Sequence, residues 1–459
     1  LVQHPDYEQL ANNGMPAESL AQTFLRAYFV DKTVSFPLNP FQMLADLNAS
    51  FAFRPFKKYE GMYIPAEDTS DIPVVGVNSQ RPITRQRYTA AHELCHHLKD
   101  SGLPTIACTS YAQSEIERYA ENFAAELLMP SKELRKQVEK YEVNGYVEFA
   151  DVVKIAEYFG VSFQACLNKI AWRLHKIKGD TSPKALVKRR NKFKPAVKRR
   201  EFGFNDVVLY EQLFDAGSDY LSIELTPRVK QRFKAEYVFQ DSRMEGVDID
   251  IEKASEIVVD LRLLGSKSEY CRQENQNIIE VAGLSLAYDY VFDSVSTLDF
   301  DLNVYEAKRI NEKLFSTAPC PEFGGNYRES NTLVLGAKFE TVDYKLIPTE
   351  MYYLDKEIQS LLEMEESMSL SEYIEAVLRI HHRLTVIHAF RDGNGRTTRA
   401  FTNMFLIRKG MPPVLFRNSE KNPYKDALAL ADESGNYAEL FEVYFKALIQ
   451  SHVELSIQQ

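Results

Sequence analysis

One short string near the carboxyl end of this 459-residue chain carries residues suited to phosphate chemistry. Residues 388–399 read His-Ala-Phe-Arg-Asp-Gly-Asn-Gly-Arg-Thr-Thr-Arg. His388 can remove a proton from an attacking hydroxyl, and Asp392 can hold Mg²⁺ against phosphates. The glycines allow backbone amides at a helix start to approach phosphate oxygens, and Arg396 and Arg399 share one helical face. The string predicts transfer of part of a nucleoside triphosphate.

A second string, His-Glu-Leu-Cys-His at 92–96, indicates a different chemistry. On a helix, His92 and His96 lie one turn apart on the same face, so both can bind one zinc ion. Glu93 can then deprotonate a water molecule on the metal. The spacing predicts a zinc hydrolase site.

A helix expected at 114–128 can complete this zinc site. Glu117 can supply a third ligand, and Glu121, one turn later, can accept a hydrogen bond from a ligand histidine. Cys95 is either a small packed side chain or a thiol close enough to the metal to make the site redox-sensitive. His97 points around the helix, and we expect it at the surface or behind the ligands.

The elements that must position these residues follow from the hydrophobic pattern. The amino-terminal part is mixed, with strand-like segments at 61–64 and 72–77 before helical stretches around 84–99 and 114–128. The carboxyl-terminal part is mostly helical, for example at 251–263, 275–293, 303–315 and 350–364. Between them, residues 176–204 are rich in Lys and Arg and interrupted by Pro and Gly. We expect a solvated basic linker there, with contact to nucleic acid or an acidic partner as the alternative.

Bulk composition limits the remaining possibilities. The length suggests about three domains of roughly 150 residues, or two larger ones. A net charge of −10 argues against a surface devoted wholly to nucleic acid. The five cysteines are scattered, which favours a reducing compartment, and no apolar run is long enough to span a bilayer; we expect a cytoplasmic protein. The chain begins at Leu1, so we expect that an upstream segment can be missing.

The strings Arg-Tyr-Thr-Ala-Ala-His-Glu-Leu-Cys-His and Phe-Ala-Ala-Glu-Leu-Leu-Met-Pro resemble the ImmA/IrrE family of zinc metallopeptidases over about residues 1–175. The resemblance implies an α+β, gluzincin-like domain that cleaves a repressor-type protein. It also implies that His92, His96 and Glu117 bind Zn²⁺ and that Glu93 is the general base. The sequence departs from the family at Cys95, usually glycine, and at position 121, usually Asn or Asp.

Residues 388–399 fill every position of the Fic signature His-x-Phe-x-Asp/Glu-Gly-Asn-Gly-Arg-x-x-Arg. The resemblance covers about 205–459 and implies a mainly α-helical domain that transfers AMP from ATP to a Ser, Thr or Tyr hydroxyl. By this resemblance His388 is the general base and Asp392 binds Mg²⁺. The residues implied in binding the nucleotide phosphates are Asp392, Gly393, Asn394, Gly395, Arg396 and Arg399, the last at the γ-phosphate.

Two further segments resemble regulatory parts of Fic enzymes. Residues 325–335 resemble a β-hairpin flap that pairs with the backbone of the target protein; the alternative is a purely structural hairpin. The string Asp241-Ser-Arg-Met-Glu245-Gly resembles an autoinhibitory helix near 240–246, in which Glu245 would pair with Arg399 and obstruct the γ-phosphate. Asp241 stands where the family has Ser or Thr, with Ser242 next to it.

We therefore expect a bifunctional cytoplasmic regulator with a zinc peptidase domain (1–175), a linker (176–204) and a Fic domain (205–459) that uses ATP and Mg²⁺. Two alternatives stay open. One domain can be inactive and serve as a sensor or scaffold. The Fic domain can instead remove AMP, or transfer UMP, phosphate or phosphocholine, because the signature fixes a phosphate loop and a base but not the group transferred.

Overall fold

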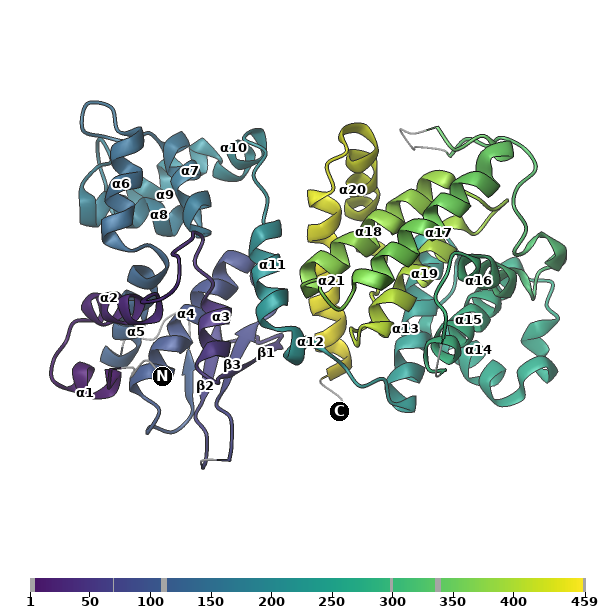
Figure 1. Cartoon of the computed structure of the whole chain (residues 1–459), viewed down its shortest axis with the longest axis horizontal. Coiled ribbons are helices and arrows are strands. Elements are labelled where there is room, and N and C mark those ends of the chain that lie inside the picture. Colours follow the sequence, from purple (N-terminus) through teal and green to yellow (C-terminus); the bar gives the residue numbers. More distant parts are fainter. Residues whose placement is uncertain (1–4, 69, 109–113, 298–299, 335–339, 457–459) are drawn as a thin grey trace. The chain divides into compact units, whose positions relative to one another are not determined.

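The computed structural model describes residues 5–68, 70–108, 114–297, 300–334 and 340–456. The chain divides into two compact units, Leu1–Tyr220 and Leu221–Gln459, each with its own core (Figure 1). The first unit combines a small sheet with helices, and the second is built from helices (Figure 1). In the described part of the chain, no helix has both the length and the apolar character needed to cross a membrane.

The sheet of the first unit has the order β1-β3-β2-β4. Strands β1 and β3 run parallel, with Phe51 opposite Val75, whereas β2 is antiparallel to both β3 and β4, with Gly61 opposite Cys108. Strands β2 and β3 lie close to the two segments predicted from the sequence. The strands are β1 (Ser50–Arg54), β2 (Gly61–Ile64), β3 (Val74–Asn78) and β4 (Ile106–Cys108).

Helices surround this sheet. Helix α4 contacts both β2 and β3, and α5 packs against α4. The side of α4 that carries Ala91, Leu94 and Cys95 is fully buried, so this helix crosses the interior of the unit. The helices are α1 (Tyr7–Asn12), α2 (Ala17–Tyr28), α3 (Pro40–Asp46), α4 (Ile83–Lys99), α5 (Glu115–Leu128), α6 (Ser131–Tyr141), α7 (Phe149–Phe159), α8 (Phe163–Lys169), α9 (Pro183–Phe193), α10 (Pro195–Glu201) and α11 (Val207–Ala216), with α12 (Ser218–Leu221) at the unit boundary.

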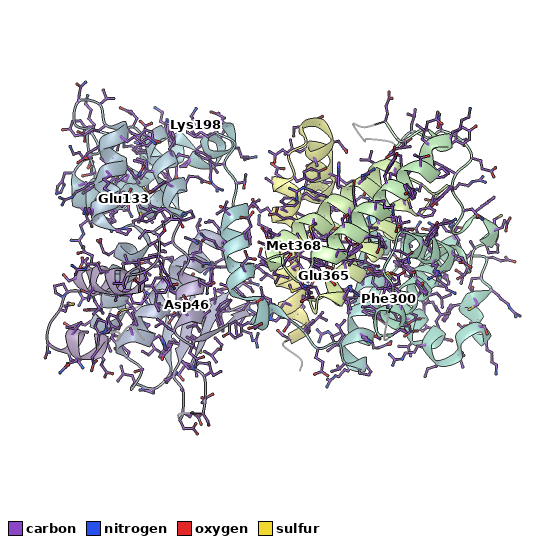
Figure 2. All side chains as sticks on the ribbon, viewed as in Figure 1. Asp46, Glu133, Lys198, Phe300, Glu365 and Met368 are labelled. Atoms are coloured by element: carbon purple, nitrogen blue, oxygen red, sulfur yellow. The ribbon has the colours of Figure 1, made fainter. Side chains whose placement is uncertain are left out.

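The basic segment 176–204 differs from the solvated linker expected from its composition. Its prolines, Pro183 and Pro195, occupy the first turns of α9 and α10, where a missing N–H costs nothing, so they begin helices instead of breaking them. Leu186 of α9 is fully buried, and Lys198 lies on α10 (Figure 2). Arg199 of α10 donates to Glu157 of α7 at 2.8 Å. The segment therefore forms part of the first unit, which continues to Tyr220.

Helix α11 also belongs to the first unit, although it lies beyond residue 205. Its Gln212 accepts a hydrogen bond from Nη1 of Arg87 at 2.5 Å. The same guanidinium, which is fully buried, donates to the carbonyl oxygens of Leu38 (2.6 Å) and Gly160 (3.2 Å). Three separate segments thus satisfy one buried cation, as buried charge requires.

The second unit is a helical bundle in which α15 packs against α13, α14, α16 and α19. Helix α18 begins with a capping box formed by Ser369 and Glu372, and its buried positions 373, 377, 380, 384 and 387 follow helical spacing. The helices are α13 (Pro227–Met244), α14 (Ile251–Leu264), α15 (Gln276–Val295), α16 (Tyr305–Phe315), α17 (Ile347–Met364), α18 (Leu370–Ile387), α19 (Asn394–Arg408), α20 (Lys421–Ser434) and α21 (Ala438–Ser456).

Candidate functional site

The structure brings together the three residues predicted to bind zinc. His92 and His96 project from one face of α4 with their Nε2 atoms 3.2 Å apart. Glu117 reaches them from α5, whose first turn is capped by Ser114; its Oε2 lies 3.2 Å from His92 Nε2, and its Oε1 lies 3.7 Å from His96 Nε2. All three side chains are buried.

A fourth potential ligand, Cys108, joins this cluster and was not predicted from the sequence. Its Sγ lies 3.9 Å from His96 Nε2 and 3.8 Å from Glu117 Oε1. One ligand atom from each of the four residues lies within 4.8 Å of all the others. Two imidazoles, a carboxylate and a thiol are the donors that zinc prefers, so the residues present fit a zinc ion.

Asp100 has the supporting role that was predicted for Glu121. Its Oδ2 lies 2.7 Å from Nδ1 of His96, which fixes the ring with Nε2 directed to the cluster. Glu121 is instead exposed, and its backbone carbonyl accepts a hydrogen bond from Tyr88 at 3.2 Å. The helical spacing from His96 to Asp100 is a signal present in the sequence, because position i+4 lies on the same face of α4.

Glu93 is fully buried beside the cluster, and its carboxylate oxygens have no well-formed hydrogen bond. Burial raises its pKa to about 8, because the carboxylate is removed from solvent. Strand β2 passes so close that a Cβ at Gly61 would overlap both Thr89 and Glu93. Cys95 is fully buried but outside the four-residue cluster.

His97 has partners on the sheet side of α4. Its Nδ1 lies 3.2 Å from the Tyr63 hydroxyl, and its Nε2 lies 3.3 Å from the Leu47 carbonyl oxygen. The side chain is half-buried, so it is more enclosed than the surface position that was one of the two expectations. These contacts give His97 a structural role between helix and sheet.

The second candidate site is the loop between α18 and α19. His388 ends α18 in a left-handed conformation (φ 48°), and Gly393 caps the start of α19 with φ 73°. The Asn394 side chain binds both backbone groups of Phe390, at 2.9 Å and 2.8 Å, so it closes the loop. Asp392 is exposed, and its Oδ1 accepts the Gly393 amide.

Two residues outside the motif hold this loop and were not predicted to do so. Asn311 of α16 donates to the Asp392 carbonyl oxygen at 3.1 Å and to the Thr397 hydroxyl at 3.0 Å. Arg328 donates through Nε to the His388 carbonyl oxygen at 2.8 Å. Both side chains are buried, and both contacts join positions far apart in sequence, so local patterns could not reveal them.

The expected flap lies only partly within the described residues, because position 335 is outside them. From 325 to 334 the described backbone contains an isolated antiparallel bridge between Tyr327 and Phe390 but no longer strand. The flap is thus anchored to the loop by its first residues, and its pairing with a target protein stays a prediction.

The His388 ring is half-buried, and its Nδ1 has no well-formed hydrogen bond. Burial lowers the pKa of His388, so the ring is neutral at neutral pH. A neutral imidazole beside an anion-binding loop can accept a proton from a hydroxyl.

The two motif arginines contact carboxylates of the protein itself. Arg396 donates through Nη1 to Glu280 of α15 at 2.9 Å, whereas its buried Nε has no partner. Arg399 donates through Nε to Asp241 at 2.6 Å and through Nη2 to Glu245 at 2.5 Å.

Asp241 and Glu245 come from the end of α13, one turn apart, so both reach the same guanidinium. Burial alone would lower the pKa of Arg399, but these two carboxylates hold it well above its usual range. Arg399 in turn lowers the pKa of Glu245 against the effect of burial. Asp241 was noted in the sequence only as a departure from Ser or Thr; its contact with Arg399 is new.

Two parts of the chain match known families. Residues 46–171 match the IrrE N-terminal-like domain of the peptidase M78 family, and residues 301–406 match the Fic/DOC family. The chain is 26% identical over 206 residues to "Protein adenylyltransferase Fic" of Drosophila yakuba, covering 45% of this chain and 39% of that protein. It is 25% identical over 224 residues to "Protein adenylyltransferase fic-1" of Caenorhabditis elegans, covering 49% and 40%. The chain thus spans about two fifths of the length of these relatives.

Solved structures of Fic proteins are also similar. Fic-1 from C. elegans gives a TM-score of 0.45 at 16% identity, covering 72% of this chain and 98% of that one. A Fic domain containing signaling protein from Bacteroides thetaiotaomicron gives 0.44 at 18% identity, covering 55% and 98%. These scores are low, so the relationship rests on the matched sequence regions. The chain carries an IrrE N-terminal-like domain followed by a Fic domain.

Proposed function

We propose that the Fic domain transfers AMP from ATP to a hydroxyl of a target protein. The observation that carries this proposal is the loop 388–399, where a neutral, half-buried His388 precedes a helix start with two arginines. The hydroxyl oxygen attacks the α-phosphorus, the bond to pyrophosphate breaks, and His388 takes the hydroxyl proton. Asp392 is the exposed carboxylate able to hold Mg²⁺, which neutralises phosphate charge when bound. The phosphates are bound by Gly393, Asn394, Gly395, Arg396 and Arg399.

The same domain is held inactive by its own acidic side chains. Glu245 accepts a hydrogen bond from Arg399, the arginine that the γ-phosphate would need. This charge-assisted contact at 2.5 Å competes directly with an anionic ligand. A nucleotide can therefore bind productively only when this ion pair opens. The flap at 325–335 would hold the target protein in an extended form.

We further propose that the first domain is a zinc-dependent peptidase of gluzincin-like fold acting on a repressor-type regulatory protein. His92, His96 and Glu117 would hold the metal, which supplies Lewis acidity when bound. Glu93 is the general base, supported by its buried carboxylate beside the cluster, whose oxygens have no well-formed hydrogen bond. The free cysteines favour a reducing compartment such as the cytoplasm.

The transferase test is intact-mass measurement after incubation with Mg²⁺ and ATP. We expect an AMP adduct on Glu245→Gly, little on the unchanged protein, and a loss of about 10²–10⁴-fold in adduct rate when His388→Ala is added. His382→Gln is the matched control, because His382 lies on the same helix but pairs with Asp432 at 2.7 Å. An adduct of different mass would support the altered-chemistry alternative. Adduct formation that is independent of His388 would contradict the assigned base.

The scaffold alternative for the first domain has its own test in the full chain. Glu93→Gln keeps the size of the side chain but removes the base. A zinc-loaded protein in which this change alters neither proteolysis nor AMP transfer would favour a non-catalytic role for the domain.

A further inference from the structure

Cys108 occupies the position of a metal ligand, although the proposed peptidase needs only three protein ligands. It ends β4, where it is paired with Gly61 of β2, and its carbonyl oxygen accepts the Glu60 amide at 3.0 Å. Both contacts join the backbone of Cys108 to the segment that contains β2, so the sheet fixes the position of the thiol. The side chain is buried, with 5% of its surface exposed.

The distances around Cys108 are slightly longer than those of a tetrahedral zinc site with its metal bound. With Zn–N near 2.05 Å and Zn–S near 2.3 Å, ligand atoms in a tetrahedron lie about 3.3–3.6 Å apart. The nitrogen and oxygen donors here are separated by 3.2–3.7 Å, and Sγ lies 3.8 Å and 3.9 Å from two of them. A thiol that is not a metal ligand would have no reason to lie at nearly equal distances from an imidazole and a carboxylate that point toward the same place.

We propose that the Cys108 thiolate is a fourth ligand of the metal, so that the site is closed at rest. The proposal rests on the zinc site proposed above and adds to it. On metal binding a sulfur–metal bond forms and the thiol proton passes to solvent. Structural zinc sites have four protein ligands, whereas catalytic sites keep one position open. Hydrolysis by this domain therefore requires Cys108 to leave the metal first.

The position of Glu93 agrees with a closed site. Its carboxylate is completely buried beside the cluster, with Gly61 packed against it on one side and no well-formed hydrogen bond. With Cys108 on the metal, the fourth position has no water for Glu93 to deprotonate. Exchange of the thiolate for a water molecule, with the sulfur taking up a proton, would provide that water and link the position of one cysteine to proteolysis.

The test is spectroscopy of the full chain loaded with Co²⁺, which reports bound sulfur by a near-ultraviolet charge-transfer band independently of activity. We expect the band in the unchanged protein and in Cys166→Ala, a control at another buried cysteine outside the cluster. We expect its loss in Cys108→Ala, with metal affinity reduced at least about tenfold. His96→Ala should remove it as well.

Each outcome separates the two proposals. Stoichiometric metal with the same sulfur-free spectrum in the unchanged protein and Cys108→Ala would overturn the fourth ligand and leave the zinc site intact. Failure of the unchanged protein to bind metal would overturn both. X-ray absorption of the zinc-loaded unchanged protein needs no variant, and the absence of a Zn–S distance of about 2.3 Å would overturn the proposal even if Cys108→Ala does not fold.

Discussion

The two candidate sites treat charge in opposite ways. In the first domain, four donor groups converge on one point, and the buried Glu93 carboxylate has no well-formed hydrogen bond. In the Fic domain, the arginine expected to meet a phosphate is already paired with two carboxylates. The donor groups of the first site suit a cation, whereas in the second site two carboxylates of the protein occupy the arginine. One domain therefore needs a ligand added and the other needs a contact removed.

We expect the largest effect on ligand binding from changes to Asp241 and Glu245, the two carboxylates that contact Arg399. Asp241→Asn and Glu245→Gln each keep the shape but replace a charged hydrogen bond by a neutral one, a difference of about 1.4 kcal/mol. Each should tighten ATP binding about tenfold, and both together up to about a hundredfold. The effect of Asp241 should be at least as large, because its side chain is 3% exposed and that of Glu245 is 36% exposed. Calorimetric titration with ATP measures both.

The matched control for these changes is Glu365→Gln in the same domain. Glu365 accepts from Arg408 at 2.9 Å, so this variant also neutralises a partner of an arginine, but at the end of α19 opposite the loop. Its ATP affinity should stay unchanged. Unaltered affinity in Asp241→Asn would show that only Glu245 restrains Arg399.

A smaller effect is expected at the first site from Asp100→Asn. The change weakens the hydrogen bond that orients His96 but leaves all four donors in place. Outer residues of this kind contribute 10–100-fold to metal affinity, and we expect about tenfold because the amide can still accept from His96. Competition with a chelator measures it. Glu121→Gln, at an exposed position, is the control and should bind metal like the unchanged protein.

A further effect, on stability instead of ligand binding, concerns a buried histidine of the Fic domain. His381 is buried between Thr402 (2.7 Å) and Tyr424 (2.8 Å), and burial lowers its pKa to about 3. The unfolded chain, with an ordinary histidine pKa of about 6.5, therefore binds one more proton between these two values. The stability that neutral His381 provides is complete above about pH 6.5 and falls on acidification by at most about 1.4 kcal/mol per pH unit.

Denaturant unfolding at several pH values measures this loss. The free energy of unfolding of His381→Gln should fall less steeply below about pH 6.5 than that of the unchanged protein, since other titrating groups are common to both. Parallel slopes would mean that His381 binds its proton equally well in the folded and the unfolded protein, which would contradict the lowered pKa.

Sequence reasoning could place residues that share one helix or one loop. His92 and His96 are linked by the helical repeat, and residues 388–399 are contiguous, so their grouping needed no tertiary information. Strands β2 and β3 could be predicted from their apolar residues, because each strand is also one continuous segment of the sequence. Glu117 lies on a second helix, and the family resemblance implied that it lies beside the two histidines.

Residues brought in by tertiary contacts could not be found in this way. Cys108 meets His96 and Glu117 only because β4 pairs with β2, a register that a three-residue strand does not reveal. Asp241 and Arg399 are 158 positions apart. In segment 176–204, prolines that usually interrupt structure instead start helices, and only their packing on α7 distinguishes the two outcomes.

The hydrogen bond between Arg87 and Gln212 limits where the chain can be truncated when the first unit is expressed alone. A fragment that stops near residue 175 would lack α11, and a fully buried guanidinium would lose one of its three partners. An unsatisfied buried charged donor costs about 1–3 kcal/mol or more, a large part of the stability of a small domain. The shortest fragment of the first unit suitable for expression should therefore extend through Tyr220, and shorter ones are expected to be less stable.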